Sequence, residues 1–532
     1  MWHRNPKRER GIGPSLTFRV RIGMQTTYVD RCNFLGIPTR LLAGLLLCLL
    51  VCGGCFQPPD AEFSLSERTK GLSQPARTGY PEEQIPGLED RLADRFGTPN
   101  VLHAWMRLPV NYGGHIGKVV EVTGEAGLNV SFGTDVETFQ DEDRTLTVMS
   151  GDHIGETIPV SAYSAESALI QTSGSGPALA AGDRIVLDFG ATLSAGRRDY
   201  MTHCVHCHGT GGDGNGPTAQ YLNPRPRDYR SGVFKFGSTA RTSRISRDDL
   251  GRIIRNGIPG TYMPSFMLLP DDELTAITEY VRWLAMRGEY ERAMVIELES
   301  DFSKEAVKGT PQPELRESLT EFLQGEFEEM INESADLFAE AWKTADTDEV
   351  IVRPDVPRVP DTPESRHRGR MLFLSDKTKC ANCHGERGRG DGPQTQDYAD
   401  NPLTRKKYPE PGLHDAWGQV VKPRDLTTGI YRGGRRPIDL FRRIHDGING
   451  TPMPENGKVL KDEEVWDLVN FVLSMPFEGR PAVPDTAGRM AHATQRGVIP
   501  GELPPAGIST ARQTTFVNPG RAVASKPPPA TR

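Results

Sequence analysis

The chain has 532 residues, a net charge of −7 and a charged fraction of 25%. This length suits about three domains of ordinary size. Because basic residues are not in general excess, the composition gives no support for a nucleic-acid partner. Glycine and proline are more frequent than in an average protein, which predicts loop-rich domains joined by linkers.

The N-terminal region has the pattern of an export signal. The apolar run from Leu41 to Val51 follows Arg31 and Arg40. The run is shorter than the ~20 residues that span a bilayer, but it suits the hydrophobic part of a signal peptide. Met24 is an alternative start that would give a signal of ordinary length.

The segment Cys52-Gly53-Gly54-Cys55 follows directly and resembles the lipobox of bacterial lipoproteins. In that resemblance Cys55 is the lipidated residue, although Cys52 stands where the family usually has leucine. Lipidation, ordinary cleavage and a retained short anchor all stay open. A lipid on Cys55 would attach the protein to a membrane surface. We therefore expect an exported protein at the periplasmic face of a membrane.

Two segments with different patterns follow. Residues 56–95 are rich in Pro, Glu, Ser and Gly and predict a flexible tether. Residues 96–192 contain short alternating runs between turn signals, which predict a small all-β sandwich or barrel. We interpret the scattered histidines of this region as ordinary residues and the domain as a docking or spacer module; they are His103, His115 and His153.

The remaining cysteines form two motifs of the same spacing. Four of the eight cysteines lie in the first 55 residues, and the others belong to C-V-H-C-H at 204–208 and C-A-N-C-H at 380–384. C-x-x-C-H is the attachment signature of haem c. Two thiols at this spacing, at the start of a helix, can form thioethers with the two vinyl groups of one porphyrin edge. The next residue then turns its imidazole under the iron.

Other uses of paired cysteines fit less well. A thioredoxin-like C-x-x-C needs no following histidine, and a zinc site would need two more ligands nearby. No cysteine outside the N-terminal group is left over for a disulfide. We therefore predict two covalent haem c groups, with thioethers and proximal iron ligands from two sets of residues: Cys204, Cys207 and His208, and Cys380, Cys383 and His384.

An internal repeat follows the two motifs. Residues 249–264 align without a gap on residues 439–454, and ten of the sixteen positions are identical. Both copies are followed by an acidic start and an amphipathic helical pattern, at 271–284 and 462–472. The two halves therefore predict two copies of one kind of domain.

On these motifs each half resembles a class I cytochrome c domain, and the pair resembles the tandem dihaem cytochromes of bacterial respiratory chains. The resemblance covers about 195–290 and 364–480. It implies a haem-binding helix, a loop with a distal methionine and a C-terminal helix that crosses the first helix. The implied distal iron ligands are Met263 and Met453, each in a G-T-x-M-P turn, with Met267 as the second choice in the first domain.

The resemblance also bears on the surroundings of each haem. In the family a proline carbonyl accepts the N–H of the proximal histidine, and Pro217 and Pro393 are the candidates. Arg227 and Arg424 correspond in the two halves and are either partners of haem propionates or parts of solvent-facing turns. The second domain contains an insertion at 401–421 that could reshape one haem edge for a partner.

The fold class is therefore multidomain: two mainly α class I cytochrome c domains, a small N-terminal all-β domain, a helical connector and disordered termini. The connector is acidic and ends in a proline-rich linker. The expected boundaries are 1–55 for the export segment, 56–95 for the tether, 96–192 for the β domain, 193–290 for the first cytochrome c domain, 291–363 for the connector, 364–480 for the second cytochrome c domain and 481–532 for the disordered tail.

Histidine–methionine ligation fills both axial positions of an iron and raises its reduction potential. The sequence therefore predicts an electron carrier between redox protein partners, without a substrate site of its own. Two alternatives remain. One is a dihaem enzyme of the peroxidase kind, which needs a haem with a releasable distal ligand. The other is a cytochrome subunit of a larger oxidoreductase.

Overall fold

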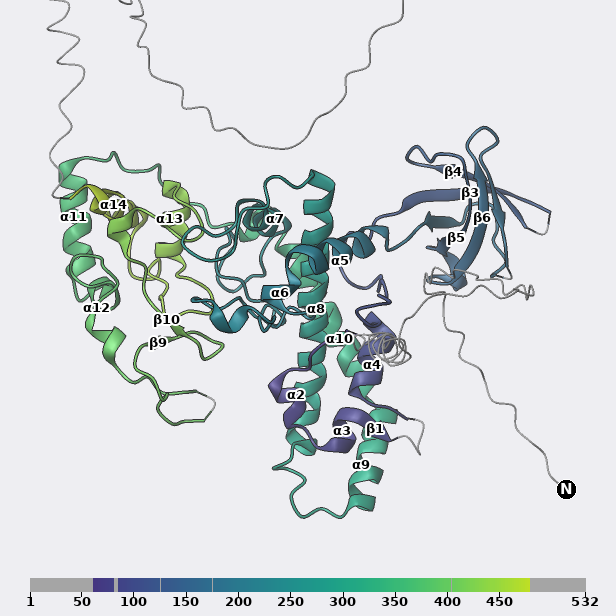
Figure 1. Cartoon of the computed structure of the whole chain (residues 1–532), viewed down its shortest axis with the longest axis horizontal. Coiled ribbons are helices and arrows are strands. Elements are labelled where there is room, and N and C mark those ends of the chain that lie inside the picture. Colours follow the sequence, from purple (N-terminus) through teal and green to yellow (C-terminus); the bar gives the residue numbers. More distant parts are fainter. Residues whose placement is uncertain (1–60, 81–84, 125, 175, 403, 479–532) are drawn as a thin grey trace, which may run out of the picture. The chain divides into compact units, whose positions relative to one another are not determined.

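The computed structural model describes residues 61–478, except 81–84, 125, 175 and 403 (Figure 1). These residues belong to one compact unit. The predicted export segment with Met24 and Cys55, and the predicted disordered tail at 481–532, lie outside the described residues. Within the described part, no helix combines the length and the apolar character needed to cross a membrane.

The first described segment is helical, which differs from the flexible tether predicted at 56–95. Leu88, Leu92 and Phe96 recur at four-residue spacing along one helix and are buried in the core shared with the first cytochrome c domain. Burial of this apolar stripe explains why the segment is ordered. Its elements are α2 (Glu67–Gly71), α3 (Gln74–Thr78), β1 (Gly79–Tyr80), β2 (Ile85–Pro86) and α4 (Leu88–Phe96).

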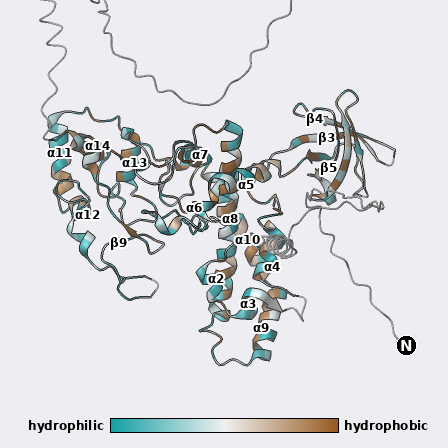
Figure 2. Cartoon of the chain, viewed as in Figure 1, coloured by the Kyte–Doolittle hydropathy of each residue, from teal (hydrophilic) through white to brown (hydrophobic). Residues whose placement is uncertain are grey.

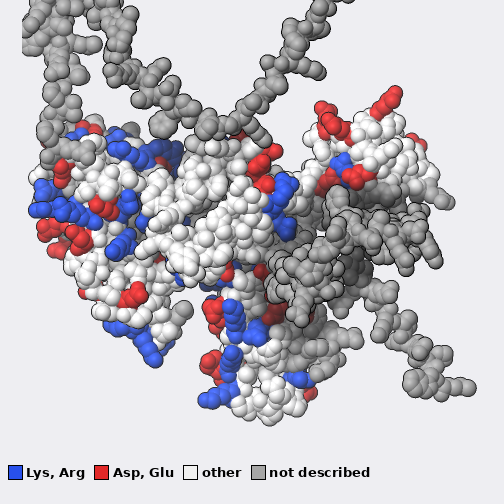
Figure 3. Space-filling view, viewed as in Figure 1, with Lys and Arg blue, Asp and Glu red and all other residues white. Residues whose placement is uncertain are grey.

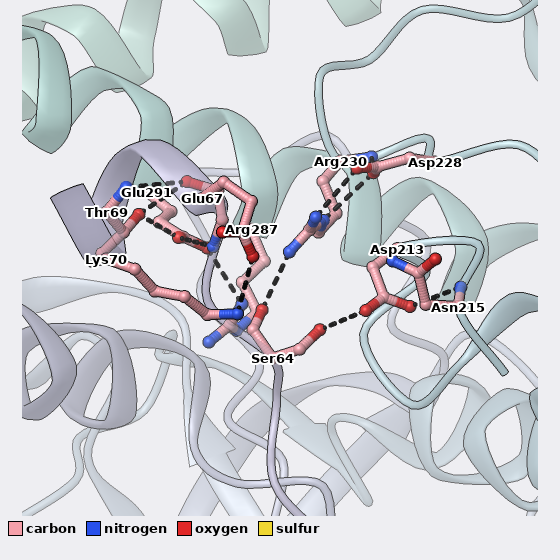
Figure 4. A network of polar contacts seen from close by, with 11 residues as sticks. Ser64, Glu67, Thr69, Lys70, Asp213, Asn215, Asp228, Arg230, Arg287 and Glu291 are labelled. Carbon is pink, nitrogen blue, oxygen red and sulfur yellow. Dashed lines mark hydrogen bonds and ion pairs between the residues drawn. The ribbon is translucent and has the colours of Figure 1, made fainter. Parts of the chain in front are cut away.

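Polar contacts also hold this segment in place (Figure 4). The Ser64 hydroxyl donates to Asp213 at 2.7 Å, and Arg230 donates to the Ser64 carbonyl at 2.9 Å. The backbone N–H of Ser66 donates to Glu291 at 2.8 Å. The start of the described chain is therefore bound to the loop after the first C-x-x-C-H motif and to the long helix α8.

The β domain is a closed barrel in which all neighbouring strands are antiparallel, in the order β3-β4-β7-β6-β5-β8. Val119, Leu146 and Ile170 are among its fully buried side chains. Polar and apolar residues are interspersed along its strands (Figure 2), as expected for a barrel with one buried face. The strands are β3 (His115–Thr123), β4 (Gly127–Phe132), β5 (Phe139–Val148), β6 (Thr157–Ser164), β7 (Leu169–Thr172) and β8 (Arg184–Leu187).

The first cytochrome c domain is built on two crossing helices, α5 (Ala191–His203) and α8 (Asp271–Phe302). Gly196 of α5 lies so close to the backbone carbonyl of Ala276 in α8 that a Cβ atom there would overlap it. A glycine is therefore needed for this close helix approach. The short α6 (Val205–His208) follows α5, and α7 (Arg247–Asn256) precedes α8.

Helix α8 is longer than the sequence predicts. It runs without interruption through residue 290, where the domain was expected to end, and stops at Phe302. The connector then folds back as α9 (Gln312–Gln324) and α10 (Phe327–Thr344). Leu319, Ile331 and Trp342 bury the predicted apolar stripe in the same core as α8. The connector therefore extends the first cytochrome c domain.

The second cytochrome c domain repeats the crossing of two helices, α11 (Pro363–Leu374) and α14 (Asp462–Ser474). Gly369 of α11 approaches the backbone carbonyl of Asp467 as closely as Gly196 approaches Ala276. The proline-rich linker packs on this domain, because Trp466 and Asn470 donate to its carbonyls. The other elements are α12 (Cys380–His384), β9 (Leu413–His414), β10 (Val420–Val421) and α13 (Pro437–His445).

Candidate functional site

Both C-x-x-C-H motifs form single helical turns. Cys204 is the residue before α6, and Cys380 begins α12. The glycine after each motif, Gly209 or Gly385, has a φ of 73°, which is in the left-handed region that favours glycine. A Cβ atom at either glycine would overlap an aspartate side chain of the following loop. The glycines after the motifs are therefore required by the turn.

The loops after the motifs make matching backbone hydrogen bonds. Gly214 N donates to the His208 carbonyl at 3.0 Å, and Gly390 N donates to the His384 carbonyl at 2.8 Å. In both domains the carbonyl of the second cysteine also accepts an N–H at 3.2 Å, from Gly216 or Gly392. These bonds close the backbone of the two motifs in the same way.

The four motif cysteines are free thiols in the structure. Burial raises the pKa of the Cys204 thiol to about 12, and it also raises the pKa of Cys380 and Cys383. Because these raised pKa values lie above neutral pH, the three thiols are protonated there, and the thiolate is the reactive form of cysteine. All four motif cysteines are partly buried.

A cavity of about 490 Å³ brings together the four residues predicted for the first haem: Cys204, Cys207, His208 and Met263. The rest of its lining is largely apolar and includes Ile254 and Val281. Its size lies within the range of roughly 300–1,000 Å³ that is typical of cofactor pockets. The cavity therefore fits a large and mainly apolar group.

The proximal histidines are partly buried, and His208 lines the largely apolar cavity. Burial lowers the pKa of His208 to about 4 and also lowers the pKa of His384. A neutral imidazole can ligate iron, whereas the protonated form cannot. Nδ1 of His208 is buried and makes no hydrogen bond. The Arg227 carbonyl lies near this ring and raises the pKa of His208, but burial lowers it by more.

In the second domain, Nδ1 of His384 donates to the Arg424 carbonyl at 3.3 Å. The prediction that Pro393 supplies this acceptor is therefore wrong. In the first domain the carbonyl that acts on His208 is that of Arg227 and not that of Pro217, although Nδ1 of His208 makes no hydrogen bond. In both domains the carbonyl near the proximal histidine thus belongs to the arginine after a later proline. Such a contact fixes the tautomer and the ring orientation of a ligating histidine.

The two methionine loops are also equivalent. Met263 N donates to the Thr261 hydroxyl at 3.1 Å, and Met453 N donates to the Thr451 hydroxyl at 3.3 Å. Each threonine hydroxyl donates to the carbonyl of an isoleucine at 2.8 Å, and each methionine carbonyl accepts from the N–H of that isoleucine. The repeated G-T-x-M-P sequence therefore forms one turn that holds the methionine in the same way twice.

In the second domain Met453 and Cys380 pack against one hydrophobic core that includes Phe441 and Leu440. The Met453 carbonyl also accepts from a guanidinium of the first domain, that of Arg241, at 3.1 Å. Met267, the second choice of ligand in the first domain, is 61% exposed and does not line the cavity.

The insertion of the second domain contacts the first domain. Asp415 pairs with Arg227 at 3.2 Å and with Lys235 at 3.5 Å, and Trp417 stacks on the Arg227 guanidinium at 3.5 Å. Arg227 is therefore engaged by protein groups rather than free to bind a propionate. Arg424 donates through Nε to the Ile430 carbonyl at 2.8 Å, which gives it a structural partner as well.

Family models match both halves of the repeat. Residues 191–281 match the model of cytochrome c oxidase, cbb3-type, subunit III, and residues 367–476 match the cytochrome c model. The chain is a c-type cytochrome. Its two cytochrome c domains carry two covalently bound haem c groups, and such domains transfer electrons to and from redox protein partners.

Other comparisons add little to this result. A comparison with curated proteins gave no match. Among solved structures, the cytochrome is similar to a chain of the reducing HAO-like protein complex of Kuenenia stuttgartiensis. The two share 24% sequence identity over 53% of this chain and 95% of that chain, with a TM-score of 0.37.

The residues of the cytochrome fit the cofactor. The cysteine thiols of each motif would hold the porphyrin edge, and the histidine imidazole and the methionine sulfur would ligate the iron. When bound, a haem c group supplies an iron that gains and loses one electron. The protein would supply the iron ligands and the apolar surroundings, both of which set the reduction potential.

Sequence reasoning missed two arginines that reach across the two cytochrome c domains. Arg241 of the first domain contacts the Met453 loop, and Arg432 of the second domain lines the cavity of the first. No local motif marks either residue, because each position depends on how the two domains pack.

Proposed function

We propose that this cytochrome is an electron carrier without a substrate site of its own, acting between protein partners outside the cytoplasm. The equivalence of the two methionine loops supports this proposal best. If both irons have a histidine and a methionine as axial ligands, neither has a free position for a substrate. Such an iron changes its coordination little between oxidation states, which favours transfer of electrons over chemistry at the metal.

Binding of carbon monoxide tests this proposal. The native, reduced dihaem protein is exposed to the gas at neutral pH, and its visible spectrum is recorded. We expect no spectral change on the timescale of mixing, because both sixth positions are filled. Rapid binding by one haem would contradict the carrier proposal and favour the dihaem enzyme of the peroxidase kind.

The proposed location is the periplasmic face of a membrane, with a lipid on Cys55. The apolar run at 41–51 and the C-G-G-C segment after it support this location. The test compares the wild type with Cys55→Ser in a bacterial host that matures c-type cytochromes. We expect the wild type in the membrane fraction and the variant in the soluble periplasmic fraction. Equal fractionation of both proteins would contradict lipid attachment at Cys55.

A second candidate function is that of a cytochrome subunit in a larger oxidoreductase. The observation in its favour is the amount of folded chain outside the cytochrome c domains: the barrel β3–β8 and the helices α2–α4, α9 and α10. The second cytochrome c domain also exposes many Lys and Arg side chains (Figure 3), among them Lys379, Arg387 and Arg389 beside its C-x-x-C-H motif. These cations suit a partner with an acidic surface. The test is the native mass of the holoprotein purified from its own membranes. A mass well above that of one chain indicates a subunit of a complex, and the mass of one chain indicates a free carrier.

A further inference from the structure

The cavity of the first haem is completed by a residue of the second domain. Arg432 precedes α13 in the second cytochrome c domain, yet it lines the same cavity as Cys204, His208 and Met263. The segment that carries it is held firmly. The Tyr431 hydroxyl donates to the Val472 carbonyl of α14 at 2.9 Å, and the Gly434 carbonyl accepts from Arg443 at 2.7 Å.

The Arg432 side chain enters this site without a counter-ion. Its Nε atom is buried and has no hydrogen-bond partner. Among the described residues that line the cavity there is no Asp or Glu. The side chain as a whole is only partly buried, but a guanidinium N–H that is shielded from water and has no partner is costly, so such a group usually faces an anion.

The other cations of the cavity have partners or a different setting. Arg225, Arg227 and Lys235 also line it. Arg225 is exposed, whereas Arg227 and Lys235 both pair with Asp415 of the insertion, and Arg227 is covered by Trp417 as well. Arg432 is the guanidinium whose Nε is buried and unsatisfied. Arg432 is therefore a hydrogen-bond donor without a charge partner. It belongs to the second cytochrome c domain but lines the haem cavity of the first.

We propose that Arg432 binds a propionate carboxylate of the haem in the first domain. The two propionates are the charged groups of haem c, and a guanidinium can form paired hydrogen bonds with a carboxylate. The haem site of the first domain is then shared between the two cytochrome c domains. This inference rests on the haem attachment at Cys204 and Cys207 that the proposed function also uses.

The proposal has a consequence for the reduction potential. A positive charge near the haem edge disfavours the more positive, oxidised iron, so it raises the reduction potential. Arg432 is therefore a positioning residue for the haem that also tunes its potential. Removal of the charge should lower the potential of the first haem and leave the second haem almost unchanged.

The test compares Arg432→Gln with Arg435→Gln in the full-length holoprotein. Arg435 is an exposed arginine of the same segment and does not line the cavity, so it controls for the loss of one positive charge. Redox titration with visible spectra gives both midpoints. We expect two haems in each protein and a lower midpoint for one haem in Arg432→Gln alone. That haem should be the one whose methionine band is lost in Met263→Ala.

Unchanged midpoints in Arg432→Gln, or equal shifts in the two variants, would overturn the proposal. If Arg432→Gln does not mature, Arg432→Lys keeps the charge but removes the fork-like donor. Its redox-difference infrared spectrum should then show a shifted carboxylate band, and an unshifted band would equally overturn the proposal. Failure of the carrier function would appear differently, as carbon monoxide binding by the wild type.

Discussion

The two cytochrome c domains have the same local construction in different surroundings. Each has a C-x-x-C-H turn closed by a glycine with positive φ, a threonine-braced methionine loop and a helix crossing that requires a glycine. In the first domain, however, the buried Tyr200 and Tyr229 share a hydrogen bond near His208. In the second, Phe373 lies near His384. The predicted iron ligands thus lie in the same local motifs in both domains, whereas the side chains around the proximal histidine differ between the domains.

The comparison extends to the outer layers. The first domain is covered by α2–α4, α9 and α10, while the second contributes an insertion and exposed basic residues around its attachment motif. We therefore expect two haems with the same ligands and different reduction potentials.

Removal of either thiol pair should remove one haem and leave the other. The variants are Cys204→Ala with Cys207→Ala, and Cys380→Ala with Cys383→Ala. Because each motif is closed by hydrogen bonds within its own loop, we expect a pyridine haemochrome count of one haem in each variant. Loss of both haems from one variant would show that attachment in the two domains is interdependent, against the comparison.

Substitution of each distal methionine should change one haem at a time. Met263→Ala and Met453→Ala should each lose about half of the weak absorption band of methionine–iron(III) ligation and lower one reduction potential, because methionine ligation raises the potential. Met267→Ala is the control in the first domain, since this residue is largely exposed. An unchanged band in Met263→Ala together with a loss in Met267→Ala would reassign the ligand.

Alanine at the helix crossings tests whether the two domains depend equally on close packing. Gly196→Ala and Gly369→Ala place a Cβ atom against a backbone carbonyl that cannot move aside cheaply. We expect each to destabilise its own domain by about 1–3 kcal/mol, as overpacking does. Gly71→Ala in α2 is a matched control, because its Cβ meets no atom within 4 Å. Denaturant titration followed through each haem's methionine band measures the effect. Equal stability of Gly71→Ala and Gly196→Ala would contradict the prediction that the helix crossing requires a glycine.

The smallest effect concerns a buried carboxylate at the start of the repeat. Burial would raise the pKa of Asp249, but hydrogen bonds from Ser238 and the charge of Arg252 outweigh it, so the pKa lies below its usual value. The stabilisation is therefore present above pH ~4, the pKa of an unfolded aspartate, and is lost as the pH falls through the lowered pKa.

Asp249→Asn should cost about 1 kcal/mol in the first domain at pH 7. The cost should shrink as the pH falls below ~4. Thermal unfolding of the wild type and the variant, at pH 7 and below pH ~4, measures this dependence. A cost that stays constant with pH would show that the carboxylate is not the source of the stabilisation.

Residues that carry the chemistry could be read from the sequence because their geometry is local. The C-x-x-C-H spacing and the G-T-x-M-P turn each fit within a few residues, and the repeat at 249–264 and 439–454 doubled the signal. The alternating pattern of 96–192 likewise predicted an all-β domain, which the structure resolves as a closed barrel.

Features that depend on packing between distant segments could not be read in this way. The helical stripe of Leu88, Leu92 and Phe96 is short and lies in a stretch rich in Pro and Gly, which favoured a tether. The carbonyl that faces each proximal histidine depends on loop direction, so a proline was chosen where an arginine carbonyl serves. The contacts of Arg241 and Arg432 depend on the packing of two domains.

A redox titration of the wild-type protein, followed through its visible spectrum, tests the central claim most directly. The account predicts two low-spin haems with separate midpoints, both showing the band of methionine–iron(III) ligation in the oxidised protein. A single haem, or a ferric haem without that band, would contradict it.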